Sequence, residues 1–108
     1  MTSTTILEAT EKLDQFIHVL DDLYWESSQM EHKDILHNLA RNLTDELIEL
    51  HKVSIQDGHF KYEPISEQLR TISPQLAWLG DNLSMVARRT RTFSDAQPMV
   101  REIQMLIN

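Results

Sequence analysis

The spacing of apolar residues is the feature that most constrains how this chain can fold. In residues 6–23 the apolar positions recur every three or four residues, and the same interval returns in residues 36–50 and 65–93. This repeat places side chains on one face of an α-helix, whereas a strand requires alternation. The pattern therefore predicts an all-α fold. The apolar positions of the first segment are Ile6, Ala9, Leu13, Phe16, Leu20 and Leu23.

Capping residues divide the first half of the chain into two helices. Thr5 and Glu8 have the spacing of a capping box at the start of the first, and Ser28 and Glu31 repeat it at the start of the second. The Asp-Gly pair at residues 57–58 provides a helix stop, with a glycine for the left-handed position. We predict two helices of about 20 and 25 residues that fold back on each other.

The second half of the chain is predicted to contain a long helix and a short one. Residues 58–63 form a loop that docks on the bundle through its aromatic side chains, and Pro64 suits the first position of a helix. The apolar repeat of residues 65–93 keeps its phase across Pro74, which favours one helix kinked there over two coaxial helices. Val100, Ile103 and Ile107 mark a short final helix.

The expected architecture is an antiparallel helical bundle of three long helices, the third kinked near Pro74, plus a short C-terminal helix. Its 108 residues are the length of one domain, expected to span residues 1–108. The chain has no cysteine, so disulfides and zinc–thiolate sites are excluded. The beginning of the chain does not resemble a secretory signal, and no apolar run approaches the roughly 20 residues that span a bilayer. We expect a cytoplasmic protein without a membrane partner.

Charge is distributed unevenly along the chain. The net charge is −7, and residues 1–57 hold twelve Asp and Glu against four Lys and Arg. Phosphate would be repelled by this acidic half, so no nucleic-acid partner is expected. The basic cluster of Arg88, Arg89 and Arg91 is expected at a helix C-terminus, where positive charge is favourable. It is interpreted as a solvated helix end, or as a contact for an acidic partner.

The residues of this chain do not form a recognisable catalytic or metal-binding motif. A metal site in a helical bundle needs ligands that converge from several helices, and the Glu-x-x-His spacing of di-iron bundles does not occur among the five histidines. Gly-rich phosphate loops and the Gly-x-Ser-x-Gly elbow are also missing from the sequence. We therefore expect a protein that is not an enzyme and binds neither a metal nor a cofactor.

One histidine suggests an alternative function. Residues 36–41 resemble the phosphoacceptor motif of histidine phosphotransfer domains, which are four-helix bundles of about this size. The match is at His37 and Leu39, while Ala40 and Arg41 stand where that family has lysine and glycine. The resemblance implies a signalling module with His37 as the phosphoacceptor.

Apolar residues that lie off the main stripes suggest the leading function. Around a helix, Trp25, Ile48, Ile55, Trp78 and Met85 lie about 100° or more from the core-facing stripe of their segment. Neighbouring helices of the same chain could bury them, or they could form a binding interface, where tryptophan is enriched. We expect a non-enzymatic protein–protein interaction module, such as a small regulator, adaptor or chaperone, which acts as a homodimer through these residues.

Overall fold

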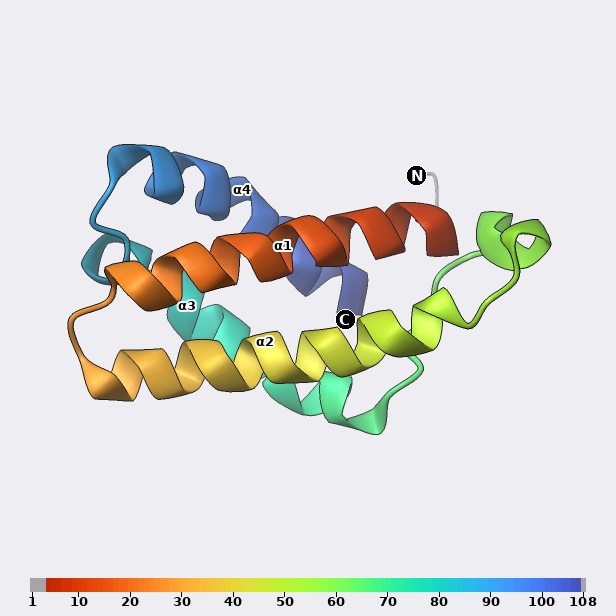
Figure 1. Cartoon of the computed structure of the whole chain (residues 1–108), viewed down its shortest axis with the longest axis horizontal. Helices are drawn as coiled ribbons and strands as arrows, with labels where there is room; N and C mark the ends of the chain where they lie inside the picture. The colour runs from red at the N-terminus through yellow and green to blue at the C-terminus, as the bar shows by residue number, and fades with distance from the viewer. Residues whose placement is uncertain (1–3, 108) are drawn as a thin grey trace.

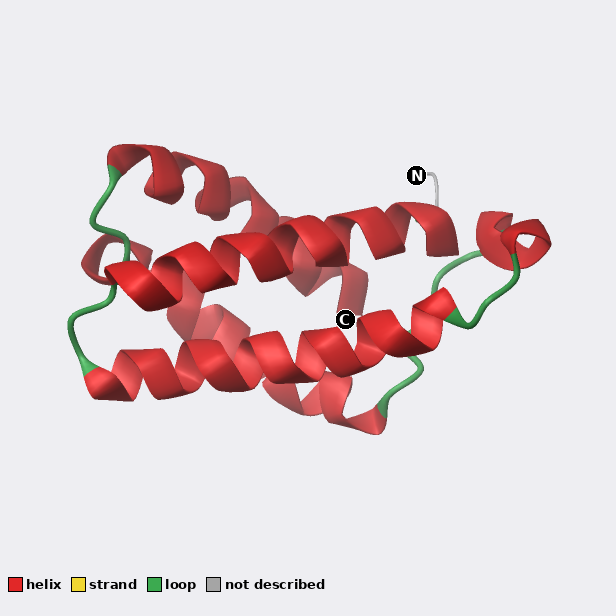
Figure 2. Ribbon diagram, viewed as in Figure 1, coloured by secondary structure: helices red, strands yellow, loops and turns green. Residues whose placement is uncertain are grey.

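A computed structural model describes residues 4–107, and in this part of the chain the structure is helical (Figure 1, Figure 2). The predicted all-α bundle is confirmed. The elements are α1 (Ile6–Glu26), α2 (Met30–His51), the 3-10 helices η1 (Ile55–His59) and η2 (Glu67–Ile72), α3 (Ser73–Val86) and α4 (Thr90–Ile107).

The helices form two layers. Helices α1 and α2 run antiparallel in front, and α3 and α4 lie behind them (Figure 1). Helix α1 packs on both α2 and α4, while α2 packs on η2 and α3. The resulting molecule measures 43 × 24 × 20 Å. Its broad front is therefore formed mainly by α1 and α2, with η1 at one end (Figure 1).

The predicted apolar stripes meet in one core. Leu13, Phe16, Leu39 and Leu43 are fully buried between the layers, as are Leu76 and Leu79 of α3. Burying a side chain of this size stabilises the fold by about 1.5–3 kcal/mol. The spacing that predicted the helices therefore also identified their inward faces.

The start of α1 agrees with the sequence pattern, but the start of α2 does not. The Thr5 hydroxyl oxygen accepts a hydrogen bond from the Glu8 backbone N–H at 3.2 Å, as its capping-box position predicts. Helix α2 instead begins after Gln29, which makes no side-chain cap. The Ser27 hydroxyl donates to the Gln29 carbonyl at 3.3 Å within this connection. The predicted capping box at Ser28 was therefore wrong.

Helix α2 ends earlier than predicted. Its last residue is His51, and the described glycines all have ordinary negative φ angles, so the Asp-Gly pair is not a left-handed stop. The Ser54 hydroxyl accepts the backbone N–H of Asp57 at 3.3 Å and starts the separate turn η1. Serine side chains compete with helical hydrogen bonds in this way. Ile55 therefore lies in η1 rather than on α2.

The single kinked helix predicted for residues 65–93 is not present. Residues 67–72 form η2, Pro74 lies in the first turn of α3, and α3 ends at Val86 because Ala87 is extended. Helix α4 begins at Thr90 and has 18 residues, so the final helix is long rather than short. The apolar repeat did not reveal the 3-10 turn η2 because its buried residues, Leu69 and Ile72, lie three residues apart, a spacing that a 3-10 turn also satisfies.

The loop that follows η1 docks on the start of α1, as predicted. The Ile6 N–H donates to the Phe60 carbonyl at 2.9 Å, and the Tyr62 N–H donates to the Thr4 carbonyl at 2.8 Å. The Tyr62 side chain is buried, whereas Phe60 is 56% exposed. Only one of the two loop aromatics therefore joins the core.

A buried carboxylate fixes the entry to η2. Glu46 of α2 is fully buried, and its carboxylate accepts hydrogen bonds from the Tyr62 hydroxyl at 2.5 Å and from the Ile65 and Ser66 N–H groups at 2.9 and 2.8 Å. These donors compensate for the removal of the charge from water. Burial and the neighbouring Glu46 raise the pKa of Tyr62, so the phenol stays protonated and keeps donating. The Glu46 carboxylate therefore has a structural role, which is to hold the chain between Tyr62 and Ser66 against α2.

Candidate interaction surface

The structure separates the five predicted interface residues into two groups. Trp25 of α1, Ile48 of α2 and Ile55 of η1 are 73%, 50% and 98% exposed. Met85 is 62% exposed on α3, in the other layer. Trp78, also on α3, is half-buried against the core, with its ring 5.0 Å from the His32 ring of α2.

Two further apolar residues join the front group. Leu7 lies 18 residues before Trp25 on α1, and Met30 lies 18 residues before Ile48 on α2. Eighteen residues make about five helical turns, so each pair shares one side of its helix. Leu7 is 62% exposed and Met30 is 69% exposed. We call the surface formed by Leu7, Trp25, Met30, Ile48, Ile55 and the groove between the two helices the α1/α2 face.

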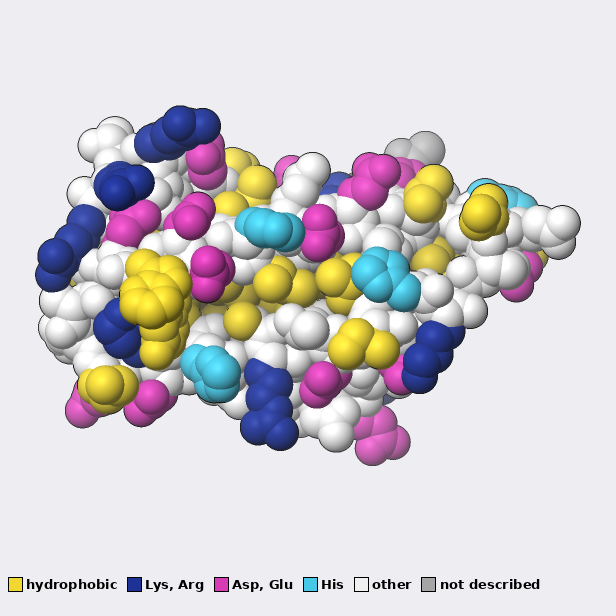
Figure 3. All heavy atoms as spheres, in the orientation of Figure 1, with side chains coloured by type: hydrophobic (Ala, Val, Ile, Leu, Met, Phe, Trp, Pro, Cys, Tyr) yellow, Lys and Arg dark blue, Asp and Glu magenta, His cyan; other side chains and the backbone are white. Residues whose placement is uncertain are grey.

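An apolar groove runs between α1 and α2. Near its Trp25 end it encloses about 320 Å³, and the apolar side chains there include Ile17, Leu20, Leu36 and Ala40. A second hollow of about 190 Å³ lies at the opposite end, where Leu7 and Ile55 line it together with Ile6, Leu50 and Val53. Figure 3 shows this apolar band along the front of the molecule, flanked by histidine and charged side chains.

One end of the groove is an ordered aromatic cluster. The Tyr24 and Trp25 rings stack edge to face with centroids 5.4 Å apart. The Lys33 ammonium lies 4.3 Å from the Tyr24 centroid and 5.5 Å from that of Trp25, and it donates to the Tyr24 carbonyl at 2.5 Å. The Tyr24 ring and the Lys33 ammonium thus contact the exposed Trp25 ring within the chain itself, and the hydrogen bond fixes Lys33 against α1. Such preorganisation reduces the entropy lost on binding.

The two sides of the groove carry different charges. On α1 the outward line contains Asp14 and Asp21 with His18 between them, and His18 Nδ1 lies 2.8 Å from the Asp14 carbonyl oxygen. This hydrogen bond, followed by the attraction of the Asp14 carboxylate, raises the pKa of His18. On α2 the outward side carries Lys33, His37, Arg41, Thr44, Ile48 and His51, and the exposed carboxylates of Asp34 and Asp45 lie beside this line.

The arginine cluster lies between the end of α3 and the start of α4. Because α3 stops at Val86, Arg88 and Arg89 lie in the connection, and Arg91 is in the first turn of α4. Arg91 makes only a long, exposed ion pair of 4.0 Å with Asp95. The expected helix C-terminus is therefore found only for Arg88 and Arg89, which follow α3, whereas Arg91 lies at a helix N-terminus, which favours negative charge.

A carboxylate from α1 supplies that negative charge. The Glu26 side chain accepts the backbone N–H groups of Arg88 and Arg89, both at 2.9 Å, and the Thr92 hydroxyl at 2.6 Å. Partial burial opposes ionisation, but the bonds from Thr92 and the two backbone groups outweigh it and lower the pKa of Glu26. The end of α1 is thereby fastened to the start of α4.

The contact between Glu26 and the start of α4 predicts a pH-dependent effect of Glu26→Gln. The ionised carboxylate stabilises the fold fully above its unfolded pKa of about 4.5, and the contribution disappears as the pH falls through the lowered folded pKa. At pH 7 we expect the variant to lose about 1 kcal/mol of unfolding free energy. Urea unfolding at a series of pH values measures the difference. A constant difference down to pH 3 would contradict the assignment.

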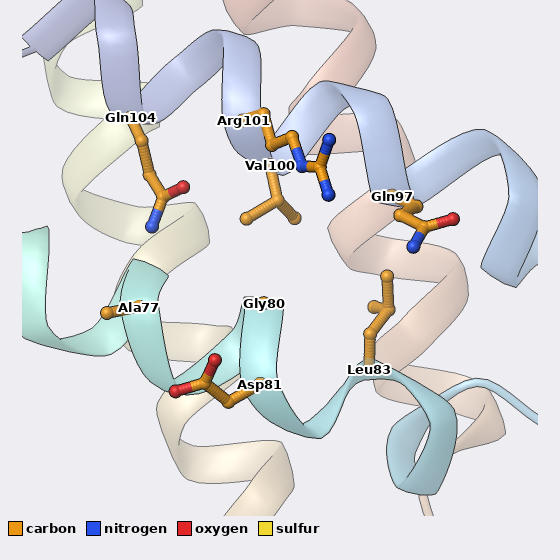
Figure 4. A pocket seen from close by; sticks show the side chains of 8 residues that line it. All are labelled: Ala77, Gly80, Asp81, Leu83, Gln97, Val100, Arg101 and Gln104. Atoms are coloured by element: carbon orange, nitrogen blue, oxygen red, sulfur yellow. The ribbon is translucent and has the colours of Figure 1, made fainter.

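A second, polar groove lies between α3 and α4. It encloses about 230 Å³. Figure 4 shows Asp81 on α3 across from side chains of α4, with the backbone of Gly80 facing Val100. A Cβ atom built on Gly80 would lie 3.5 Å from Val100 Cγ1, which is an ordinary contact distance. The space at Gly80 is therefore open to a methyl group. The α4 residues of this groove are Gln97, Val100, Arg101 and Gln104.

Gly80→Ala should stabilise the protein. Alanine removes the entropic cost of a glycine inside a helix, and the added methyl group reaches Val100 without a clash. We expect a gain of about 0.5–1 kcal/mol. Thermal unfolding followed by circular dichroism measures it, and a lower melting temperature would show that the two helices cannot accept the extra atom.

Residues 4–107 contain no group of three His, Asp or Glu side chains placed to hold a metal ion. Across the same residues, none of the helices is both long enough and apolar enough to cross a membrane. Comparisons of the chain with models of protein families, with curated proteins and with solved structures find no match.

Proposed function

We propose that this protein is a non-enzymatic interaction module, a small regulator, adaptor or chaperone, that binds protein through the α1/α2 face and forms a homodimer. The observation that carries the proposal is the gathering of exposed Leu7, Trp25, Met30, Ile48 and Ile55 beside one apolar groove. Contiguous apolar surface of this kind marks interaction sites on soluble proteins.

The position of Trp25 supports this role. Its side chain is exposed beside the larger hollow, and its ring contacts Tyr24 and Lys33. Because these contacts already restrict the ring, binding would remove little further side-chain entropy from Trp25. Tryptophan is among the residues that contribute most to binding when a partner excludes water from it. The proposal assigns Trp78 a structural role instead, because its ring already packs against His32 and the core.

Trp25→Ser should weaken self-association without unfolding the protein. We expect a loss of about 2 kcal/mol in dimerisation free energy, typical of a hot-spot residue. The change in unfolding free energy of the monomer should stay within about 0.5 kcal/mol because the side chain is exposed. Sedimentation velocity over a dilution series measures the first quantity, and urea unfolding measures the second.

Met85→Ser is the matched control, since Met85 has a similar exposure on α3. We expect this variant to associate like the wild type. If Met85→Ser weakens the dimer and Trp25→Ser does not, the interface lies on α3. If the wild type stays monomeric at all concentrations, self-association is refuted.

Phosphotransfer through His37 is the second candidate. The observation that favours it is the exposed position of His37 at the edge of the larger hollow, where a phosphoryl donor has access. Acetyl phosphate followed by intact mass spectrometry separates the two functions. As an interaction module the protein should gain no phosphoryl group, whereas a gain that His37→Gln abolishes would establish phosphotransfer.

A further inference from the structure

We infer that the α1/α2 face binds a basic amphipathic helix of another protein, with the apolar side of that helix in the groove and its Lys and Arg side chains toward α1. This inference rests on the proposed function and names the class of partner. Such a partner would compete with a second copy for the face, because both need the same apolar residues. The inference follows from the charges around the groove and from the spacing of its apolar residues.

One side of the groove is acidic. Leu7 and Trp25 are the ends of a line on α1 whose members are three or four residues apart, so they share one side of the helix. Between its ends the line holds three exposed carboxylates and one exposed histidine. Nucleic acid or an anionic bilayer would be repelled by these carboxylates, whereas a cationic protein segment would be attracted. The residues between the ends are Glu11, Asp14, His18 and Asp21.

The α2 side does not offset this charge. It holds Lys33 and Arg41, but the exposed carboxylates of Asp34 and Asp45 lie beside them. The Lys33 ammonium is already engaged within the chain, since it donates to the Tyr24 carbonyl at 2.5 Å and lies over the Tyr24 ring. Arg41 is then opposed by two carboxylates of its own helix. The α1/α2 face as a whole is therefore acidic.

The other nearby cations lie away from the middle of the face or are paired. Lys12 is half-buried and lies on the inward side of α1, seven residues before buried Val19. Lys52, which follows α2, pairs with Glu49 at 3.0 Å. The arginines at positions 88 and 89 lie beyond the last residue of α1, whose carboxylate accepts their backbone N–H groups. Cations of a partner would therefore find the carboxylates of the groove unopposed at the middle of the face.

The spacing of the apolar residues fits a helix. Leu7 and Trp25 are 18 residues apart, which corresponds to about 27 Å of helix, and Met30 and Ile48 repeat this separation on α2. A partner helix of about 18 residues along the groove would reach both hollows, and amphipathic helices bind apolar grooves in this way. An extended segment would need partners for its backbone hydrogen bonds, which two α-helices do not offer because their own backbone groups are already paired.

Peptide binding tests the inference. The basic probe is a peptide of about 18 residues made of Leu, Ala and Lys, with the leucines on one side of a helix. The neutral probe is the same peptide with Gln in place of Lys. Fluorescence anisotropy of the labelled peptides at pH 8, where an ordinary histidine is neutral, measures both dissociation constants. We expect the basic peptide to bind at least about tenfold more tightly, and added salt should remove the difference because exposed charges are screened.

Substitutions locate the binding site. Asp14→Asn combined with Asp21→Asn should weaken binding of the basic peptide roughly fivefold, since each exposed ion pair contributes little, and should not weaken binding of the neutral one. Asp81→Asn combined with Glu102→Gln is the matched control, because it removes two charges from exposed positions on α3 and α4. We expect the control to change the dissociation constant by less than about twofold. Trp25→Ser should weaken binding of both peptides.

The outcomes separate this inference from the proposed function. Equal binding of the basic and neutral peptides, or an equal effect of the two double variants, would overturn the basic partner and leave the proposed function standing. The same conclusion would follow if neither peptide binds while the wild type dimerises through Trp25. If neither peptide binds and the wild type stays monomeric, the inference and the proposed function both fail.

Discussion

The rest of this structure depends on the burial of the inward stripe of α1. Leu13, Phe16 and Leu23 have no exposed surface, because α2 covers one flank of the stripe and α4 the other. Helix α1 packs on α2 in front and on α4 behind, so it joins the two layers. Two polar contacts then fix its ends. The loop after η1 binds the start of α1 through backbone hydrogen bonds, and Glu26 fastens its end to the start of α4.

The same two-layer packing creates the α1/α2 face. Helices α3 and α4 both lie on one side of the front pair, so the outward sides of α1 and α2 have no cover within the described chain. Apolar residues placed there stay in contact with water, which is unfavourable for an isolated molecule. A partner that covers them would remove this cost, and the proposed homodimer would do so.

Two carboxylates, those of Glu46 and Glu26, are removed from solvent wholly or in part by the fold. Their roles differ from those of the exposed charges on the α1/α2 face. Glu46 is buried and fully hydrogen-bonded at the entry to η2, and Glu26 accepts the backbone N–H groups that precede α4 together with the Thr92 hydroxyl. Both are satisfied within the chain, so they determine the path of the backbone and leave no unpaired charge for chemistry. The groups available to a partner are the exposed ones, among them Asp14, Asp21 and Arg41.

The sequence by itself determined that this chain is an α-helical bundle and which side of each helix faces the core. The three-to-four repeat carries that information because α-helical periodicity is a local property. It also indicated that Trp25, Ile48 and Ile55 lie off the core. Only the tertiary structure decided where the helices break. Glu26 and Glu46 hold α4 and η2 through contacts across 62 and 20 residues, and local patterns do not contain such partners. The packing of α3 and α4 on one side likewise decided that Trp25 and Ile48 share an open face while Trp78 is half-buried, since burial depends on which helices become neighbours.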